Sequence, residues 1–172
     1  MRIQVVVGGM LVALGAVTAW VTVGACQAQG TTVLLVRHAD REPGKDELSA
    51  AGRERALKLA RSLRDVRITA IYQTQYRRTR EMAAPVAAGF ALTPIEVDAR
   101  DSESVARDIR KSYPGETVLV VGHSNTVPKI VAALGGPSLA DIAEDDFGNL
   151  WVLQVCRCGF KRASLTRLRY GD

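Results

Sequence analysis

The chain has only two histidines, and each of them ends a run of apolar residues. His38 closes the stretch VLLVRH, directly after Arg37, and His123 closes VLVVGH. A neutral imidazole can attack phosphorus and hold a phosphoryl group covalently. The planar guanidinium of an arginine suits phosphate or carboxylate. These residue types in these positions therefore indicate chemistry on an anionic group.

A third basic group is available in the stretch YQTQYRRTRE, which follows another apolar run. Arg77, Arg78 and Arg80 cannot all point the same way in the first turn of a helix, and their spacing alone does not choose among them. Asn125 follows His123 at a predicted helix start, where free backbone N–H groups suit an anion.

Apolar runs alternate along the chain with stretches of helical period, which predicts an α/β fold. We expect a three-layer sandwich in which helices flank a mainly parallel central sheet. The expected strands are 33–36, 67–74, 93–98 and 117–122, with a closing hairpin of 149–155 and 163–170. The expected helices are 49–65, 76–90, 101–113 and 125–136, with a kink or break at Pro85 and an N-cap at Asp101 or Ser102.

Parallel α/β sheets bind ligands outside the carboxyl ends of their strands. His38 and His123 both fall at that position, so they can share one site if their strands are neighbours.

Three motifs then resemble the histidine phosphatase superfamily, also called phosphoglycerate-mutase-like, over nearly all of residues 31–170. They are VLLVRHAD, IYQTQYRRTREMAAPVA and VLVVGHSNTVP. Departures from the family pattern are Ala39 for glycine, Thr74–Gln75 for Ser-Pro and Glu81–Met82 for Gln-Thr.

The resemblance assigns roles to individual residues. It implies His38 as the phosphate-accepting nucleophile, and its register selects Arg78 among the three arginines. It implies that Arg37, Arg78 and His123 bind the phosphoryl oxygens and stabilise the transition state, with a backbone N–H of Asn125 as an addition.

Many members of the family also carry a carboxylate that protonates the leaving group. The candidates here are Glu96, Asp98, Asp101 and Glu103, of which Asp98 is favoured because it ends a predicted strand. A site without such an acid would suit a substrate with a good leaving group, such as a phosphohistidine.

We therefore expect a phosphatase that needs no metal or cofactor and hydrolyses a phosphomonoester or phosphohistidine through a phosphohistidine intermediate on His38. Its substrate would be a small phosphorylated molecule or a phosphoprotein. A phosphoglycerate-type mutase is disfavoured because no long insertion is visible. Two other classes stay open: a non-catalytic phosphate-binding lipoprotein, and a serine esterase built on GHSNT. The esterase would need a histidine after Ser124, and the sequence has none there.

Charge does not indicate nucleic acid. The net charge is +5, but basic residues alternate with acids in helix-like stretches such as RERALKLARSLRD, a pattern typical of solvated helix faces.

The N-terminus has the layout of an export signal. Arg2 precedes an apolar run from Val5 to Ala25, and small residues precede Cys26. We expect a lipoprotein leader over residues 1–26 with lipidation at Cys26, a tether over 27–31 and a phosphatase domain over 32–172. The domain would then be exported and held at a membrane, in the periplasm or at the cell surface. Cleavage after Ala28, giving a soluble secreted protein, and an uncleaved anchor are the alternatives.

Two further cysteines, Cys156 and Cys158, lie in VLQVCRCGF. We interpret them as ordinary strand residues, because a bridge between residues i and i+2 is strained and a lone CxC is only half a metal site.

Overall fold

The computed structural model describes residues 30–156 and 163–171. The predicted leader, its lipidation site Cys26, most of the predicted tether and Cys158 lie outside these residues. In the part of the chain that is described, no helix has the length and apolar character needed to cross a membrane.

Six strands form one sheet in the order β3-β2-β4-β1-β5-β6. Strands β1, β4, β2 and β3 are parallel, whereas β5 runs antiparallel to β1 and β6 antiparallel to β5. The mainly parallel sheet and the closing hairpin are thus confirmed. The bounds are β1 Thr31–Arg37, β2 Ala70–Thr74, β3 Ile95–Val97, β4 Thr117–Gly122, β5 Asn149–Val155 and β6 Ala163–Arg169.

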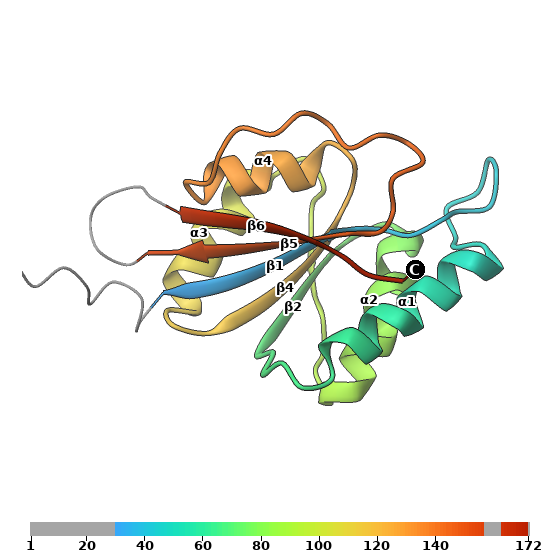
Figure 1. The fold of residues 1–172 in the computed structure, drawn as a ribbon, viewed down its shortest axis with the longest axis horizontal. Coiled ribbons are helices and arrows are strands. Elements are labelled where there is room, and N and C mark those ends of the chain that lie inside the picture. Colours follow the sequence, from blue (N-terminus) through green and yellow to red (C-terminus); the bar gives the residue numbers. More distant parts are fainter. Residues whose placement is uncertain (1–29, 157–162, 172) are drawn as a thin grey trace, which may run out of the picture.

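Helices cover both faces of this sheet, which makes the three layers that the sequence predicts (Figure 1). One face carries α1 (Ala50–Leu63) and α2 (Arg77–Phe90), which pack against each other. The opposite face carries α3 (Ser102–Ser112) and α4 (Thr126–Ala133).

Strand β1 has apolar side chains on both faces because it lies inside the sheet. Val33 and Leu35 are buried in the core under α3 and α4, whereas Leu34 and Val36 are buried in the core under α1 and α2. Each such side chain contributes about 1.5–3 kcal/mol when it leaves water. Burial on both sides therefore fixes the position of the strand that leads into His38.

The N-caps of α1 and α3 lie where the sequence predicts them, and of the kink or break predicted at Pro85 the break is absent. The Ser49 side chain caps α1 by accepting the Gly52 N–H at 3.1 Å, and Asp101, one of the two predicted caps of α3, accepts the Ser104 N–H at 2.9 Å. Helix α2 runs through Pro85 without a break. A proline removes only one helical hydrogen bond, and the buried residues Met82 and Val86 keep this helix packed on the core.

The interpretation of Cys156 as an ordinary strand residue was wrong. Cys156 lies directly after β5, and it is disulfide-bonded. A residue just past a strand end is not held by the backbone hydrogen bonds of the sheet, so its side chain can turn toward another cysteine.

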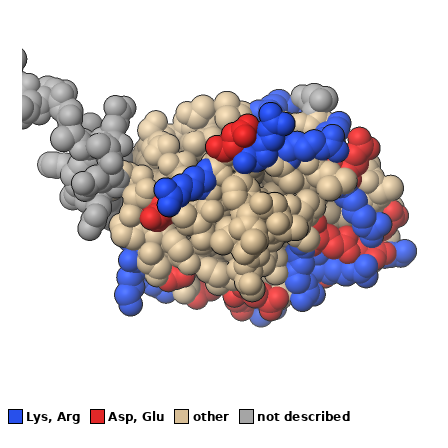
Figure 2. Space-filling model, turned by 90° about the horizontal axis from the view of Figure 1, so that it is seen from below, with Lys and Arg blue, Asp and Glu red and all other residues tan. Residues whose placement is uncertain are grey.

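The surface carries charges of both signs. On the face shown in Figure 2, basic side chains lie beside acidic ones around the edge of the domain, and the middle of that face is uncharged. This arrangement agrees with the expected solvated helix faces.

Candidate active site

His38 and His123 meet because their strands are neighbours. In the β1–β4 register Arg37 pairs with Gly122, so each histidine is the first residue beyond the paired strand ends. The His38 N–H donates to the Gly122 carbonyl at 2.9 Å, and the two imidazole centroids lie 5.4 Å apart. A Cβ on Gly122 would lie 2.7 Å from the Thr126 hydroxyl oxygen, so this close approach requires glycine.

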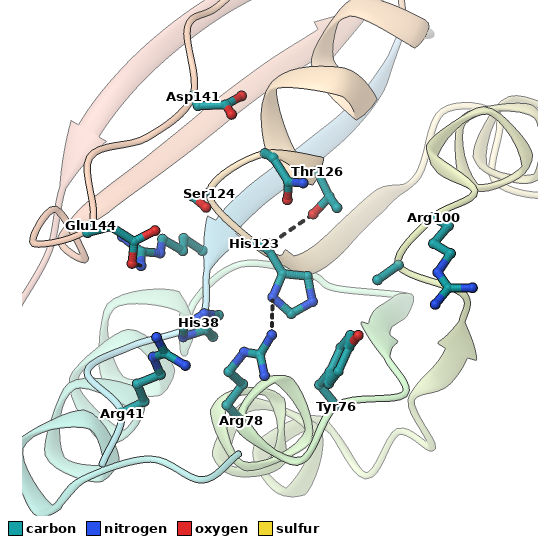
Figure 3. A pocket seen from close by; sticks show the side chains of 13 residues that line it. His38, Arg41, Tyr76, Arg78, Arg100, His123, Ser124, Thr126, Asp141 and Glu144 are labelled. Atoms are coloured by element: carbon teal, nitrogen blue, oxygen red, sulfur yellow. Dashed lines mark hydrogen bonds and ion pairs between the residues drawn. The ribbon is translucent and has the colours of Figure 1, made fainter. Parts of the chain in front are cut away.

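The two rings line an open cavity of about 440 Å³ (Figure 3). The cavity wall contains the nucleophile and every phosphate-binding residue that the sequence and the resemblance predict. These are Arg37, His38, Arg78, His123 and Asn125. The wall also contains Arg41, Tyr76, Ala99, Arg100, Ser124, Thr126, Asp141 and Glu144.

The imidazole of His38 is held as a neutral base with one free nitrogen. Its Nδ1 lies 2.8 Å from the Ala39 carbonyl oxygen, which can only accept, so we assign the proton to Nδ1. This leaves a lone pair on Nε2, which has no hydrogen-bond partner among the described residues. Burial lowers the pKa of His38 to about 4, against a raising contribution from the Ala39 hydrogen bond, and the charges of Arg78 and Arg37 lower it further. The ring is therefore uncharged near neutral pH.

His123 has partners on both ring nitrogens. Arg78 lies 3.3 Å from Nδ1 through Nη2, and an arginine can only donate, so Nδ1 is the acceptor. Nε2 then carries the proton and donates it to the Thr74 hydroxyl oxygen at 2.9 Å. Burial lowers the pKa of His123 to about 3, and the charge of Arg78 and the neighbouring His38 act in the same direction.

Two buried threonines continue this hydrogen-bonded chain. The Thr74 and Thr79 hydroxyl oxygens lie 2.9 Å apart, and Thr79 donates to the Tyr76 carbonyl at 2.8 Å. In the sequence, Thr74 stands out only as a departure from the family motif, and no motif marks Thr79. The available signal was that both flank the start of α2 next to Arg78.

Arg37 is 3% exposed and is held on three sides. Its Nη1 donates to the Ala143 carbonyl at 2.6 Å, its Nη2 donates to Glu144 at 3.1 Å, and its guanidinium lies 4.4 Å from the centroid of the Phe147 ring. Its buried Nε–H has no partner among the described residues. Burial lowers the pKa of Arg37, and Glu144 opposes that shift.

Arg78 is the arginine of the second motif that enters the cavity. It donates to Asp46 at 2.6 Å and stacks on Tyr76, 4.3 Å from the ring centroid, and its buried Nε–H is also without a described partner. Arg77 and Arg80 point elsewhere and pair with Glu81 and Glu96 respectively. Because buried donors normally find acceptors, the two spare Nε–H groups of Arg37 and Arg78 favour a bound anion.

The four carboxylates proposed from the sequence do not line the cavity. Asp98 accepts the Arg100 N–H at 2.9 Å, Glu96 pairs with Arg80, Asp101 caps α3, and Glu103 lies at a neighbouring hollow. The acids on the cavity wall of the described structure are Asp141 and Glu144. Both come from the segment between α4 and β5, and no sequence motif marks them.

No set of three or more histidine, cysteine, aspartate or glutamate side chains is placed to hold a metal ion in residues 30–156 and 163–171.

The fold and the cavity define an α/β domain with a cavity lined by two imidazoles and two guanidinium groups, a set of side chains that suits an oxyanion. The sequence model of the histidine phosphatase superfamily (branch 1) matches residues 33–104, which include His38 and Arg78. Over these residues the chain is similar to this superfamily, as its first two motifs suggest.

Several solved structures have the same fold as this chain. The protein histidine phosphatase SixA, complexed with tungstate, is 15% identical, with 80% of this chain and 96% of that chain covered at a TM-score of 0.61. A mycobacterial glucosyl-3-phosphoglycerate phosphatase complexed with VO3 is 16% identical, with 81% and 99% covered at a TM-score of 0.64. YhfR of Bacillus stearothermophilus is 22% identical, with 72% and 90% covered at a TM-score of 0.54. Comparison with curated proteins gave no significant match.

Proposed function

We propose that the protein is a metal-independent phosphatase that hydrolyses a phosphomonoester or a phosphohistidine through a phosphohistidine intermediate on His38. The observation that carries this proposal is the state of the His38 ring. Its proton is donated to the Ala39 carbonyl, and its unprotonated Nε2 lies in a cavity lined by the buried Arg37 and the half-buried Arg78. A neutral, oriented imidazole is the form that can act as a nucleophile.

The reaction has two displacements. In the first, the Nε2 lone pair forms a bond to phosphorus while the bond from phosphorus to the leaving group breaks, and the leaving group departs with that electron pair. In the second, water attacks phosphorus, the N–P bond breaks with return of its electron pair to Nε2, and the proton of the water passes to solvent. Inorganic phosphate is then released.

The arginines and His123 would hold the phosphoryl oxygens during both steps. Fixed donors that face a developing negative charge typically accelerate a reaction by about 100- to 1000-fold each. The Thr74 hydroxyl can accept from Nε2–H of His123 or donate to Nε2 when the proton moves to Nδ1. His123 could therefore present an N–H to the phosphoryl group without becoming charged, which suits a ring whose pKa burial lowers.

The arrangement of acids favours a substrate whose leaving group departs easily. The predicted acids lie outside the cavity, and Glu144 is engaged with Arg37. Asp141, the other acid on the cavity wall, lies beyond Ser124 as seen from His38 in Figure 3. A phosphohistidine has such a leaving group, and one structural neighbour is by name a protein histidine phosphatase. This observation supports phosphohistidine over an alkyl phosphate.

The alternatives receive less support. A phosphate-binding protein without catalysis has no need for a free Nε2 on His38. An esterase would need a histidine bonded to Ser124, whereas the described contacts of both imidazoles go to other residues. A mutase would also form a phosphohistidine intermediate, but it would transfer the phosphoryl group to a second substrate rather than to water.

The proposal is tested by a hydrolysis assay on the full chain with an aryl phosphate and a phosphohistidine peptide, with and without EDTA. We expect the wild type to release phosphate from both substrates at rates that EDTA does not change. The His38→Ala variant should release no phosphate from either substrate. Activity that EDTA abolishes, or that His38→Ala retains, would show that the mechanism is different. Phosphate transfer to an added acceptor in place of water would identify a mutase.

We also propose that the chain is exported and tethered by lipid at Cys26. The support is the order of the N-terminal sequence: Arg2, an apolar run and small residues before the cysteine. Several acyl chains on one residue give stable membrane anchoring, whereas a single chain binds only marginally.

A further inference from the structure

Two arginines on the cavity wall have no part in the reaction proposed above. Arg41 follows β1, and Arg100 lies between β3 and α3. Both residues are exposed, and Figure 3 shows their side chains on opposite sides of the pair formed by Arg78 and His123. They therefore flank the opening of the cavity, whereas Arg37 and His38 lie at its buried end.

The charges of these two rim arginines are not shared with a carboxylate. Within the described part of the chain, no hydrogen bond or ion pair engages either side chain. By contrast, Arg37 pairs with Glu144 and Arg78 pairs with Asp46. Each rim guanidinium thus presents its full set of donors to the cavity and to solvent.

Arg41 is also close enough to the nucleophile for its charge to contribute to the lowered pKa of His38. Negative charge on the cavity wall is confined to the segment after α4, from which Asp141 and Glu144 come. A substrate that carries a negative group besides its phosphate would therefore place that group away from this segment and near the rim arginines.

In phosphoryl transfer the leaving group lies roughly in line with the attacking atom and on the far side of phosphorus. Because His38 is buried at one end of the cavity, the leaving group must point toward the opening. We propose that Arg41 and Arg100 bind a second anionic group, a carboxylate or a further phosphate, on the leaving group. The preferred substrate is then a phosphorylated compound or segment with a neighbouring negative charge. This inference rests on the proposed phosphatase function.

Three phosphonates that cannot be hydrolysed separate the rim from the phosphate site. Methylphosphonate has one anionic group, phosphonoacetate adds a carboxylate, and methylenediphosphonate adds a second phosphonate. Isothermal titration calorimetry on the full chain should show at least one of the two larger ligands bound more tightly than methylphosphonate, by on the order of 10-fold or more for each charged pair. If phosphonoacetate binds more tightly than methylphosphonate, the second group is a carboxylate. If methylenediphosphonate does, the second group is a phosphate.

Variants locate the effect. Arg41→Gln and Arg100→Gln should each reduce the advantage of the doubly anionic ligand, and the double variant should remove it, while methylphosphonate binding changes by less than about 3-fold. Arg61→Gln is the matched control, because Arg61 is exposed on α1 and does not line the cavity. It should leave all three affinities unchanged.

Two results would overturn the inference and are distinguishable. Equal affinities for all three ligands, or an advantage that survives in the double variant, would exclude the rim subsite while the phosphatase function stands. If no phosphonate binds and no phosphate ester is hydrolysed, the proposed function fails and the subsite fails with it.

Discussion

The Thr74 hydroxyl oxygen lies 2.9 Å from Nε2 of His123, inside the protein. Strand β2 supplies the threonine, and the segment after β4 supplies the histidine, so the contact joins two neighbouring parallel strands at their carboxyl ends. Arg78 occupies the other ring nitrogen, and the hydroxyl therefore determines which way the imidazole faces and where its proton resides.

Thr74→Val should lower kcat/KM by on the order of 10- to 100-fold, because it leaves the buried Nε2–H without a partner. Thr74→Ser keeps the hydroxyl and should retain most of the activity. The ¹⁵N chemical shifts of His123 give a readout that reports on the proton position. If the valine variant shows the wild-type tautomer and wild-type kinetics, Thr74 has no positioning role.

Substitutions at the adjacent arginines should separate the phosphate-binding residue from its neighbour. Arg78→Lys should weaken competitive inhibition by vanadate by about 10-fold or more, because a point charge cannot replace a planar fork of donors. Arg77→Ala should bind vanadate like the wild type, since Arg77 pairs with Glu47 and Glu81 on the surface. The inhibition constants of the two variants measure this difference, and the opposite ranking would mean that Arg77 is the ligand.

The lowered pKa values of the two histidines predict how activity depends on pH. His38, with a pKa of about 4, should remain a neutral nucleophile down to about pH 5, so kcat/KM should fall only below that value. A loss of activity centred near pH 6.5 would show that the imidazole of His38 is not shielded as the structure indicates. A pH–rate profile, with the ionisation of the substrate taken into account, tests this.

The same shifts affect stability. An unfolded histidine binds a proton below about pH 6.5, whereas the folded rings resist it down to about 4 and 3. The unfolded state therefore binds more protons in this window, and the free energy of unfolding should fall as pH drops from about 6.5 to 4. Urea unfolding at several pH values should show this slope, and His123→Asn should reduce it.

Cys26→Ser should move the protein from the membrane fraction to the soluble fraction, or leave it attached through an uncleaved leader, without lowering kcat. Cell fractionation and mass spectrometry of the N-terminus distinguish these results. A wild-type protein that begins at Gln29 and carries no lipid would mean ordinary secretion.

The sequence could predict those parts of the site that depend on local order along the chain. His38 and His123 directly follow apolar strands, so their place at one sheet edge follows from the α/β pattern. Arg78 needed the family resemblance, because three arginines share one helical turn. The arrangement of these side chains in one cavity then depends on the order of the strands in the sheet.

Other features depend on contacts between distant segments. Glu144 reaches Arg37 from a segment 107 residues further along the chain, and no motif marks it. Asp98 was favoured as the acid because it ends a strand, yet its carboxylate accepts a backbone N–H two residues away. Loop side chains like these are positioned by tertiary packing, which residue spacing does not encode.

The central claim is that His38 carries the phosphoryl group during turnover. The most direct measurement is mass spectrometry, under alkaline conditions that preserve phosphohistidine, of protein quenched while it turns over a phosphorylated substrate. We predict that the wild type carries phosphate on His38. The His123→Ala variant should also carry it, although its turnover should be slower by about 100- to 1000-fold. The His38→Ala variant should carry no phosphate. Phosphate on any other residue, or a His38→Ala variant that still labels, would contradict the account.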